Sequence, residues 1–152
     1  MRLALLLSSL SSLSSLALLA GCSPSGEPAA PPAAEAPAEA TLGGVDLNQP
    51  LRALGTEPFW GVEITPSAMI YTGVDRDPQR AGNPGPVVQG TTAIYTAETD
   101  DGTTMVVTLI ATECSDGMSD RVYPLTARVE LGEVTLNGCA ASQAFLNAAP
   151  AP

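Results

Sequence analysis

Apolar and polar residues alternate with a period of two along much of the chain after Gln49, a pattern typical of β-strands that bury one face. From Ala127 to Leu131, apolar residues alternate with an arginine and a glutamate. From Trp60 to Ile64, every second residue is likewise large and apolar, so these side chains would share one face of a strand. The pattern predicts an all-β domain.

Turn-forming residues divide this pattern into separate strands. Asp101-Gly102 and Gly132-Glu133 each lie between two strand-like stretches, so both predict β-hairpins. The segment from Asp75 to Pro86 is dense in proline and glycine and predicts a loop. We therefore expect residues 49–146 to form one small antiparallel barrel or sandwich of about six or seven strands, with a helix only near 140–146.

A different composition precedes the predicted domain. Residues 23–48 are rich in proline, alanine and glutamate and lack large aromatic residues, so they cannot bury enough apolar surface to fold. We expect the segment 22–48 to be a disordered linker that spaces the domain from its point of attachment. Residues 147–152 predict a short, loose tail.

The N-terminal segment 1–21 has the composition of a secretory signal peptide, with a basic start, an apolar middle and small residues at its end. Leu19-Ala20-Gly21-Cys22 resembles a bacterial lipobox. The resemblance implies that Cys22 carries a diacylglycerol and an amide-linked fatty acid such as palmitate, which together anchor a protein stably. The serine after Cys22 favours the periplasmic face of the outer membrane over the inner membrane. An uncleaved membrane anchor is the alternative, although a spanning helix needs about 20 predominantly apolar residues.

The chain has three cysteines, an odd number for an exported protein. If Cys22 carries lipid, Cys114 and Cys139 remain to form one disulfide in an oxidising compartment. They lie 25 positions apart, and closing such a loop stabilises a fold by roughly 3 to 4 kcal/mol. We expect the bridge to join two strand ends and to hold the loop from Ser115 to Asp120. A two-thiolate metal site is the alternative, but it lacks histidine or further cysteine ligands.

Charge narrows the classes of partner. Without the signal peptide, five arginines face sixteen acidic residues, and the chain has no lysine or histidine. A surface of this charge repels polyanions, so we expect no nucleic acid partner and favour a cationic protein. Because histidine is the commonest general base and metal ligand near neutral pH, its absence predicts a protein that is not an enzyme and holds no cofactor or metal.

Three segments stand out as motifs: Gly55-Thr56-Glu57-Pro58-Phe59-Trp60, then Cys114 to Pro124 (CSDGMSDRVYP), then Leu136-Asn137-Gly138-Cys139-Ala140. Together they resemble a family of bacterial envelope proteins, often lipoproteins, that share G-x-E-P-F-W and C-x-D-G-M-S-D-x-x-Y-P motifs. The resemblance covers about Leu54 to Ala140. The family has no established activity, so the resemblance implies an envelope location and assigns no catalytic residue.

In the first motif, Glu57, Phe59 and Trp60 are candidate binding or structural residues. Pro58 disfavours helix at Glu57, and neighbours in a strand point to opposite faces, so one aromatic ring is expected in the core and the other at a rim. Glu57 is expected to pair with Arg121 or to cap a backbone turn. An acid or base role for Glu57 is the alternative.

The second motif concentrates Asp116, Met118, Asp120, Arg121 and Tyr123. Aspartate beside glycine predicts a turn in which side-chain oxygens accept hydrogen bonds from nearby backbone amides. A calcium loop of the EF-hand type needs ligands at alternate positions and a distant glutamate, whereas these two aspartates are four positions apart. We therefore expect a rigid turn, with a binding role as the alternative.

Three classes of function follow. The favoured hypothesis is a membrane-anchored, non-catalytic binding or structural domain with an unidentified partner. The second is an inhibitor of a cationic C-type lysozyme, by analogy with small disulfide-bridged envelope lipoproteins whose serine- and glycine-containing loop before a tyrosine is echoed by Ser115 to Tyr123. The third is a small hydrolase or metal-handling protein. A nucleophilic serine would need a general base, and the chain has no histidine or lysine to serve as one. Glu57 with Asp116 or Asp120 could form the carboxylate pair of a glycosidase. Met118 alone is a poor site for a soft metal ion, which binds several sulfur or imidazole ligands.

Overall fold

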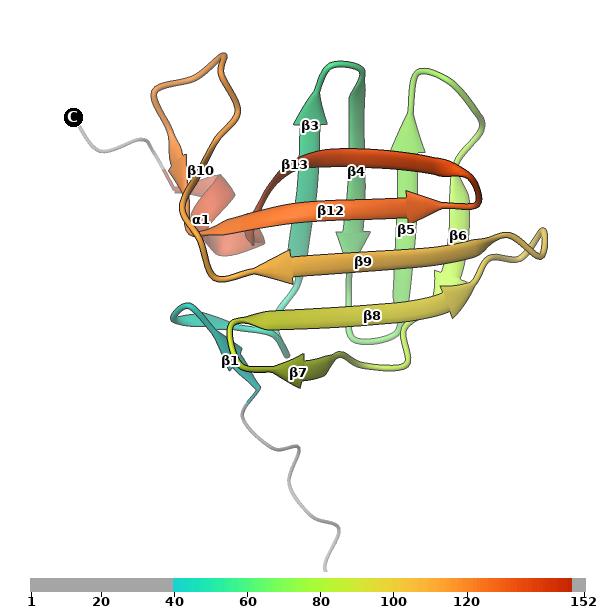
Figure 1. Cartoon of the computed structure of the whole chain (residues 1–152), viewed down its shortest axis with the longest axis horizontal. Coiled ribbons are helices and arrows are strands. Elements are labelled where there is room, and N and C mark those ends of the chain that lie inside the picture. Colours follow the sequence, from blue (N-terminus) through green and yellow to red (C-terminus); the bar gives the residue numbers. More distant parts are fainter. Residues whose placement is uncertain (1–39, 149–152) are drawn as a thin grey trace, which may run out of the picture. The chain divides into compact units, whose positions relative to one another are not determined.

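A computed structural model describes residues 40–148. The expected signal peptide, the expected lipidation site Cys22 and the linker as far as residue 39 lie outside the described residues, as do residues 149–152 of the expected tail. The other two residues of that tail are ordered, because Asn147 ends α1 and Ala148 is its C-cap. The described part is all-β, as predicted, and its main element is a nine-stranded antiparallel sheet that curls into a half-barrel (Figure 1). No helix in this part is long and apolar enough to span a membrane.

The main sheet has the strand order β6-β5-β4-β3-β13-β12-β9-β8-β7, and two further pairs, β1-β2 and β10-β11, lie beside it. The elements are β1 (Thr41–Leu42), β2 (Val45–Asp46), β3 (Leu51–Thr56), β4 (Phe59–Ile64), β5 (Ala68–Gly73), β6 (Gln79–Gly82), β7 (Val87–Gln89), β8 (Thr92–Glu98), β9 (Thr104–Ile110), β10 (Cys114–Ser115), β11 (Val122–Tyr123), β12 (Leu125–Leu131), β13 (Val134–Ser142) and α1 (Gln143–Asn147).

Strand β13 joins the two halves of the sheet, which cross each other in Figure 1. It pairs with β12 from Val134↔Leu131 to Ala140↔Leu125 and with β3 from Cys139↔Leu54 to Ser142↔Leu51. At the far edge, β6 meets the end of β8 through the isolated bridge Ala81↔Thr99. The sheet therefore curls around one interior and is not a sandwich of two sheets.

The predicted number of strands was wrong. The additional strands are short pairs or edge strands of two to four residues, and β6 lies inside the segment 75–86 that was expected to be a loop. Such strands are too short to show a period-two pattern, and proline or glycine flanks several of them. The two predicted hairpins, β8-β9 and β12-β13, are confirmed.

The expected linker boundary also differs from the structure. Within residues 40–48, Thr41 to Asp46 form the β1-β2 hairpin, and the side chains of Leu42, Val45 and Leu47 are buried in the core. These three apolar residues cover one end of the half-barrel, which outweighs the high local content of glycine and polar residues. The folded domain therefore begins before Gln49.

The interior of the half-barrel contains the apolar residues that the alternating pattern predicts to be buried. Trp60, Val62 and Ile64 of β4 are buried together, as are the alternate residues of β12 from Ala127 to Leu131. Each large apolar side chain that is fully buried contributes about 1.5 to 3 kcal/mol to folding. The faces of β4 and β12 that the alternating pattern predicts to be buried are therefore the faces that point into the half-barrel.

A second, smaller apolar cluster lies on the outer side of β13 and β3. Its buried members are Tyr123, Cys139 and Ala141, and Leu54 and Phe145 pack against it. Helix α1 begins at Gln143, later than predicted, because residues 140–142 continue β13. The outer cluster is the base on which the disulfide-bound loop rests.

Candidate functional site

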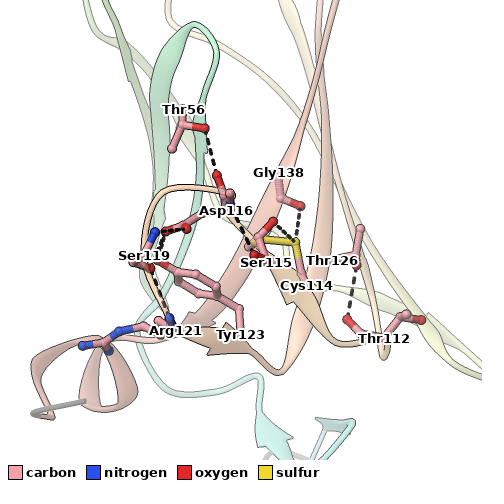
Figure 2. Close-up of a disulfide and its surroundings, with 12 residues drawn as sticks. Thr56, Thr112, Cys114, Ser115, Asp116, Ser119, Arg121, Tyr123, Thr126 and Gly138 are labelled. Atoms are coloured by element: carbon pink, nitrogen blue, oxygen red, sulfur yellow. Dashed lines mark hydrogen bonds between the residues drawn. A yellow bond between two sulfur atoms is a disulfide. The ribbon is translucent and has the colours of Figure 1, made fainter. Parts of the chain in front are cut away.

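The three motif segments, which are far apart in the sequence, meet at one end of the domain. The first forms the end of β3, the turn and the start of β4, the second forms β10, its loop and β11, and the third lies in β13. Two links join them: the Cys114–Cys139 disulfide and a hydrogen bond of 3.1 Å from Thr56 Oγ1 to the carbonyl oxygen of Asp116 (Figure 2). We call residues 55–60, 115–119 and 137–138 the motif surface.

The predicted disulfide between Cys114 and Cys139 is confirmed, with the two Cα atoms 5.5 Å apart. Its expected position at two strand ends was wrong for Cys139, which lies within β13 and not at its end. Cys114 Sγ also lies 3.4 Å from the carbonyl oxygen of Gly138, a contact and not a hydrogen bond because the bridged sulfur carries no proton. The bridge therefore fastens the β10-β11 hairpin across the outer face of the sheet.

Asp116 organises the loop between β10 and β11. Its Oδ1 accepts hydrogen bonds from the backbone amides of Met118 and Ser119, at 3.0 and 2.8 Å. Its Oδ2 accepts from the hydroxyl groups of Ser119 and Tyr123, at 2.9 and 2.8 Å (Figure 2). The predicted turn is confirmed, and Asp116 makes four bonds that hold the loop in one conformation.

These bonds also set the ionisation of Asp116. The backbone amides of Ser119 and Met118, followed by the hydroxyl groups of Tyr123 and Ser119, hold the pKa of Asp116 well below its usual range. Burial and the bond to Asp116 raise the pKa of Tyr123, so the phenol stays protonated and donates. The pair is therefore a fixed structural contact at neutral pH.

Replacing Asp116 by asparagine tests this account. An amide nitrogen in place of Oδ2 would face two hydroxyl donors, so we expect a loss on the order of 1 kcal/mol of unfolding free energy at pH 7. Because the pKa of Asp116 falls on folding, its contribution is present above the ordinary value of 3.8 and is lost as the pH drops through the folded pKa. Urea unfolding of wild type and Asp116→Asn should thus differ less at pH 3 than at pH 7. An equal difference at both pH values would contradict this role.

Arg121 has a structural role that differs from the expected ion pair with Glu57. Its guanidinium donates to the carbonyl oxygens of Phe145, Leu146 and Ala148, at 2.8, 3.3 and 3.1 Å. A cation is favourable at the C-terminal end of a helix, where carbonyl groups lack partners. Arg121 therefore fastens α1 to the loop, and the prediction of a Glu57–Arg121 pair was wrong.

Trp60 is the buried part of the motif surface, and its side chain is only 5% exposed. The indole packs against two glycines: a Cβ added to Gly55 would lie 2.6 Å from Trp60 Cε2, and one added to Gly138 would lie 3.0 Å from Trp60 Cζ2. Glycine inside a strand often marks such a close approach. This feature of the sequence could have identified both residues, which the sequence analysis did not name as site residues.

Phe59 and Trp60 point to opposite sides of β4, as predicted, and Phe59 is 56% exposed. Val74, also exposed, follows Gly73, the residue paired with Trp60. On the outer face beside Phe59 is a shallow hollow of about 410 Å³, whose wall includes Arg52 and Thr72. The exposed ring therefore forms one border of the motif surface.

A second hollow, of about 340 Å³, lies between the β3-β4 turn, the loop and β13. Apart from three glycines, it is lined by Leu54, Thr56, Glu57, Ser115, Asp116, Met118 and Asn137. We call this hollow the fork cleft. It brings Glu57 near Asp116 and the 69% exposed Met118, whereas Asp120 does not line it. Thr56 and Asn137 lie within the motif segments, but the sequence analysis did not name either one as a candidate site residue.

The geometry limits what this surface can do chemically. Ser119 donates to a carboxylate that is held ionised, so Asp116 is a poor base, and its four accepted bonds leave it unsuited to act as a proton donor. Among residues 40–148, no group of three or more acidic or cysteine side chains is placed to hold a metal ion. The arrangement instead suits recognition by shape, apolar contact and hydrogen-bond acceptors.

A larger cavity, of about 610 Å³, lies beside α1 and the β1-β2 turn. Its wall includes Gly44, Pro50, Pro124 and Phe145. None of the candidate residues predicted from the motifs lines it, so the cavity is separate from the motif surface.

In comparisons with known proteins, no family model, curated protein or solved structure matches the chain.

Proposed function

We propose that the chain is a lipid-anchored envelope protein whose β domain binds a cationic protein through the motif surface and catalyses no reaction. The observation that carries the proposal is the convergence of the three motif segments on one face. There Phe59 and Met118 are exposed near Glu57, which makes no ion pair with any residue between 40 and 148. Aromatic residues and methionine are enriched at protein interfaces, where charged residues lie mainly at the rim.

The rigidity of the loop supports a binding role. The disulfide, the bonds of Asp116 and the Thr56–Asp116 link all restrict the loop before any partner arrives. A surface that is already ordered loses less conformational entropy on binding than a mobile one. The structure thus presents Met118 and Glu57 at small entropic cost.

Electrostatics favours a basic partner. Four of the described arginines already have acceptors: Arg52 pairs with Glu63, Arg76 with Asp75, Arg128 with Glu130, and Arg121 binds carbonyl groups of α1. The many remaining carboxylates give a negative potential that attracts cations and weakens in salt. We therefore expect association with a cationic protein to slow markedly as the ionic strength rises.

The proposed anchor is Cys22, with the outer membrane favoured by the serine that follows it. Three acyl chains hold a protein at a membrane far more firmly than one. Metabolic labelling with palmitate should label the wild-type protein and not Cys22→Ser. Equal labelling of both proteins would contradict this attachment.

Affinity capture tests the binding role. The mature chain, solubilised from membranes, is used to capture proteins from an envelope extract at low and at high salt. The double variant Phe59→Ser with Met118→Ser is compared with Val87→Ser with Val88→Ser, which changes two exposed residues of the edge strand β7. We expect a basic protein that wild type and the β7 variant capture at low salt only, and that the motif-surface variant loses. Capture that survives the first variant or high salt would contradict the proposal.

A further inference from the structure

The fork cleft lies where two strands of the main sheet separate. Pairing between β3 and β13 ends at Leu54↔Cys139, although β3 continues to Thr56 and β13 extends back to Val134. Gly55 and Gly138 lie just beyond this last pair, with the indole of Trp60 against both. The indole of Trp60 fills the place that side chains at these two positions would occupy, and the cleft lies beyond the last pair, beside the loop between β10 and β11.

The cleft is rich in hydrogen-bond acceptors and has no cation. Its wall includes two acidic residues, Glu57 and Asp116, and three residues with a side-chain oxygen, Thr56, Ser115 and Asn137. No arginine lines it, and the one nearest in the loop sequence, Arg121, binds carbonyl groups of α1. An anion would therefore be repelled, and a cation would meet acceptors without having to displace an existing ion pair.

The carboxylates of Asp116 and Glu57 differ in whether they can pair with a bound cation. The carboxylate of Asp116 accepts three hydrogen bonds from the loop and a fourth from Tyr123 of β11, so Asp116 contributes negative potential more than a free acceptor. Glu57 is exposed and makes no ion pair with any residue in the part of the chain that the structure describes. Glu57 is therefore the group that a bound cation would contact.

We propose that the fork cleft receives one basic side chain, arginine in particular, of the protein partner. This inference rests on the proposed function and adds the chemistry of recognition. A volume of about 340 Å³ is at the lower end of the range for ligand pockets and suits a single side chain. The guanidinium pairs with Glu57 and donates to Asn137, and the exposed thioether of Met118 packs along the alkyl stem.

An NMR titration tests the inference without knowledge of the partner. The probe is N-acetyl-arginine methylamide, and its control is the citrulline analogue, which has nearly the same shape and no charge. The protein is the mature chain with Cys22→Ser. We expect saturable shifts of the amides of Gly55, Gly117 and Gly138 with the arginine probe and none with citrulline. Equal shifts with both probes, or shifts spread over the whole acidic surface, would overturn the inference.

Two variants that remove the same charge sharpen the test. Glu57→Gln removes the proposed contact, and Glu133→Gln removes a charge from the β12-β13 turn, which is outside the cleft. Both residues are exposed, so both variants should keep the wild-type spectrum apart from local changes. We expect Glu57→Gln to weaken binding of the arginine probe about tenfold or more and Glu133→Gln to leave it unchanged. The same affinity in both variants would overturn the assignment of Glu57.

The outcome for the cleft is separable from the outcome for the proposed function. If the arginine probe does not bind but the Phe59 and Met118 variant still loses the captured protein, the cleft is wrong and the binding role stands. If the probe binds at the cleft but that variant retains the captured protein, the proposed function is wrong and the cleft is confirmed as a basic side-chain site.

Discussion

Replacing Gly138 by alanine is expected to destabilise the domain by about 3 kcal/mol or more, which is the upper part of the range for overpacked cores. A Cβ at this position would overlap the carbonyl oxygen of Leu54 and lie 2.8 Å from its carbonyl carbon, both in the backbone of β3. Backbone atoms in a paired strand cannot move aside as the end of a flexible side chain can. The two strands would have to separate further, or Trp60 would have to leave its place.

Trp60 provides the measurement, because it is the only tryptophan in the chain. Urea unfolding followed by its fluorescence should show a lower midpoint for Gly138→Ala and a native spectrum of a more exposed indole. The control is Gly82→Ala in β6, where an added Cβ meets no atom within 4 Å and the backbone is not left-handed. That change is expected to be nearly neutral or slightly stabilising. Equal stability of the two variants would show that the close approach at Gly138 is not needed.

Removing the disulfide is expected to have the second large effect. The double variant Cys114→Ala with Cys139→Ala should lose roughly 3 to 4 kcal/mol of unfolding free energy, because a loop of 25 residues is no longer closed in the unfolded chain. Cys139 is buried in the outer cluster, so its replacement also removes apolar contacts with Tyr123 and Leu54. The interior of the half-barrel contains neither cysteine and should stay folded.

Hydrogen exchange distinguishes this local effect from general loosening. Amides of the loop, in particular those of Met118 and Ser119 that bond to Asp116, should exchange faster in the double variant. Amides of β9 and β12 in the middle of the sheet should keep their order of protection. Unchanged exchange in the loop would mean that Asp116 and Tyr123 hold it without the bridge.

The inner faces of β4 and β12 could be predicted because alternation is a local property of the sequence. The disulfide could be predicted from the number of cysteines, because Cys22 resembles a lipidation site. The length of β13 could not be predicted, because residues 138–142 are small and have little preference for strands. The hairpin at residues 40–48 was missed because its burial depends on the open end of the half-barrel, which exists only after folding.

In the candidate site, too, some features could be predicted from the local sequence and others depend on contacts between distant segments. Exposure of Phe59 beside buried Trp60, and the turn around Asp116, follow from local rules and were predicted correctly. The contacts of Arg121 depend on where the end of α1 packs, which the helix expected near 140–146 does not specify. The fork cleft depends on where pairing between β3 and β13 stops, which is a property of sheet register and of two glycines on separate strands. No pattern within one segment contains that information.

Site-specific photocrosslinking in intact cells tests the central claim most directly. A benzophenone amino acid is placed at Phe59 on the motif surface or, as the control, at Val87, which is similarly exposed on β7. The binding role predicts a crosslink from position 59 to one basic envelope protein, which the Glu57→Gln change weakens and which is absent from position 87. The same products from both positions, or no protein product from position 59, would contradict the claim that this surface recruits a partner.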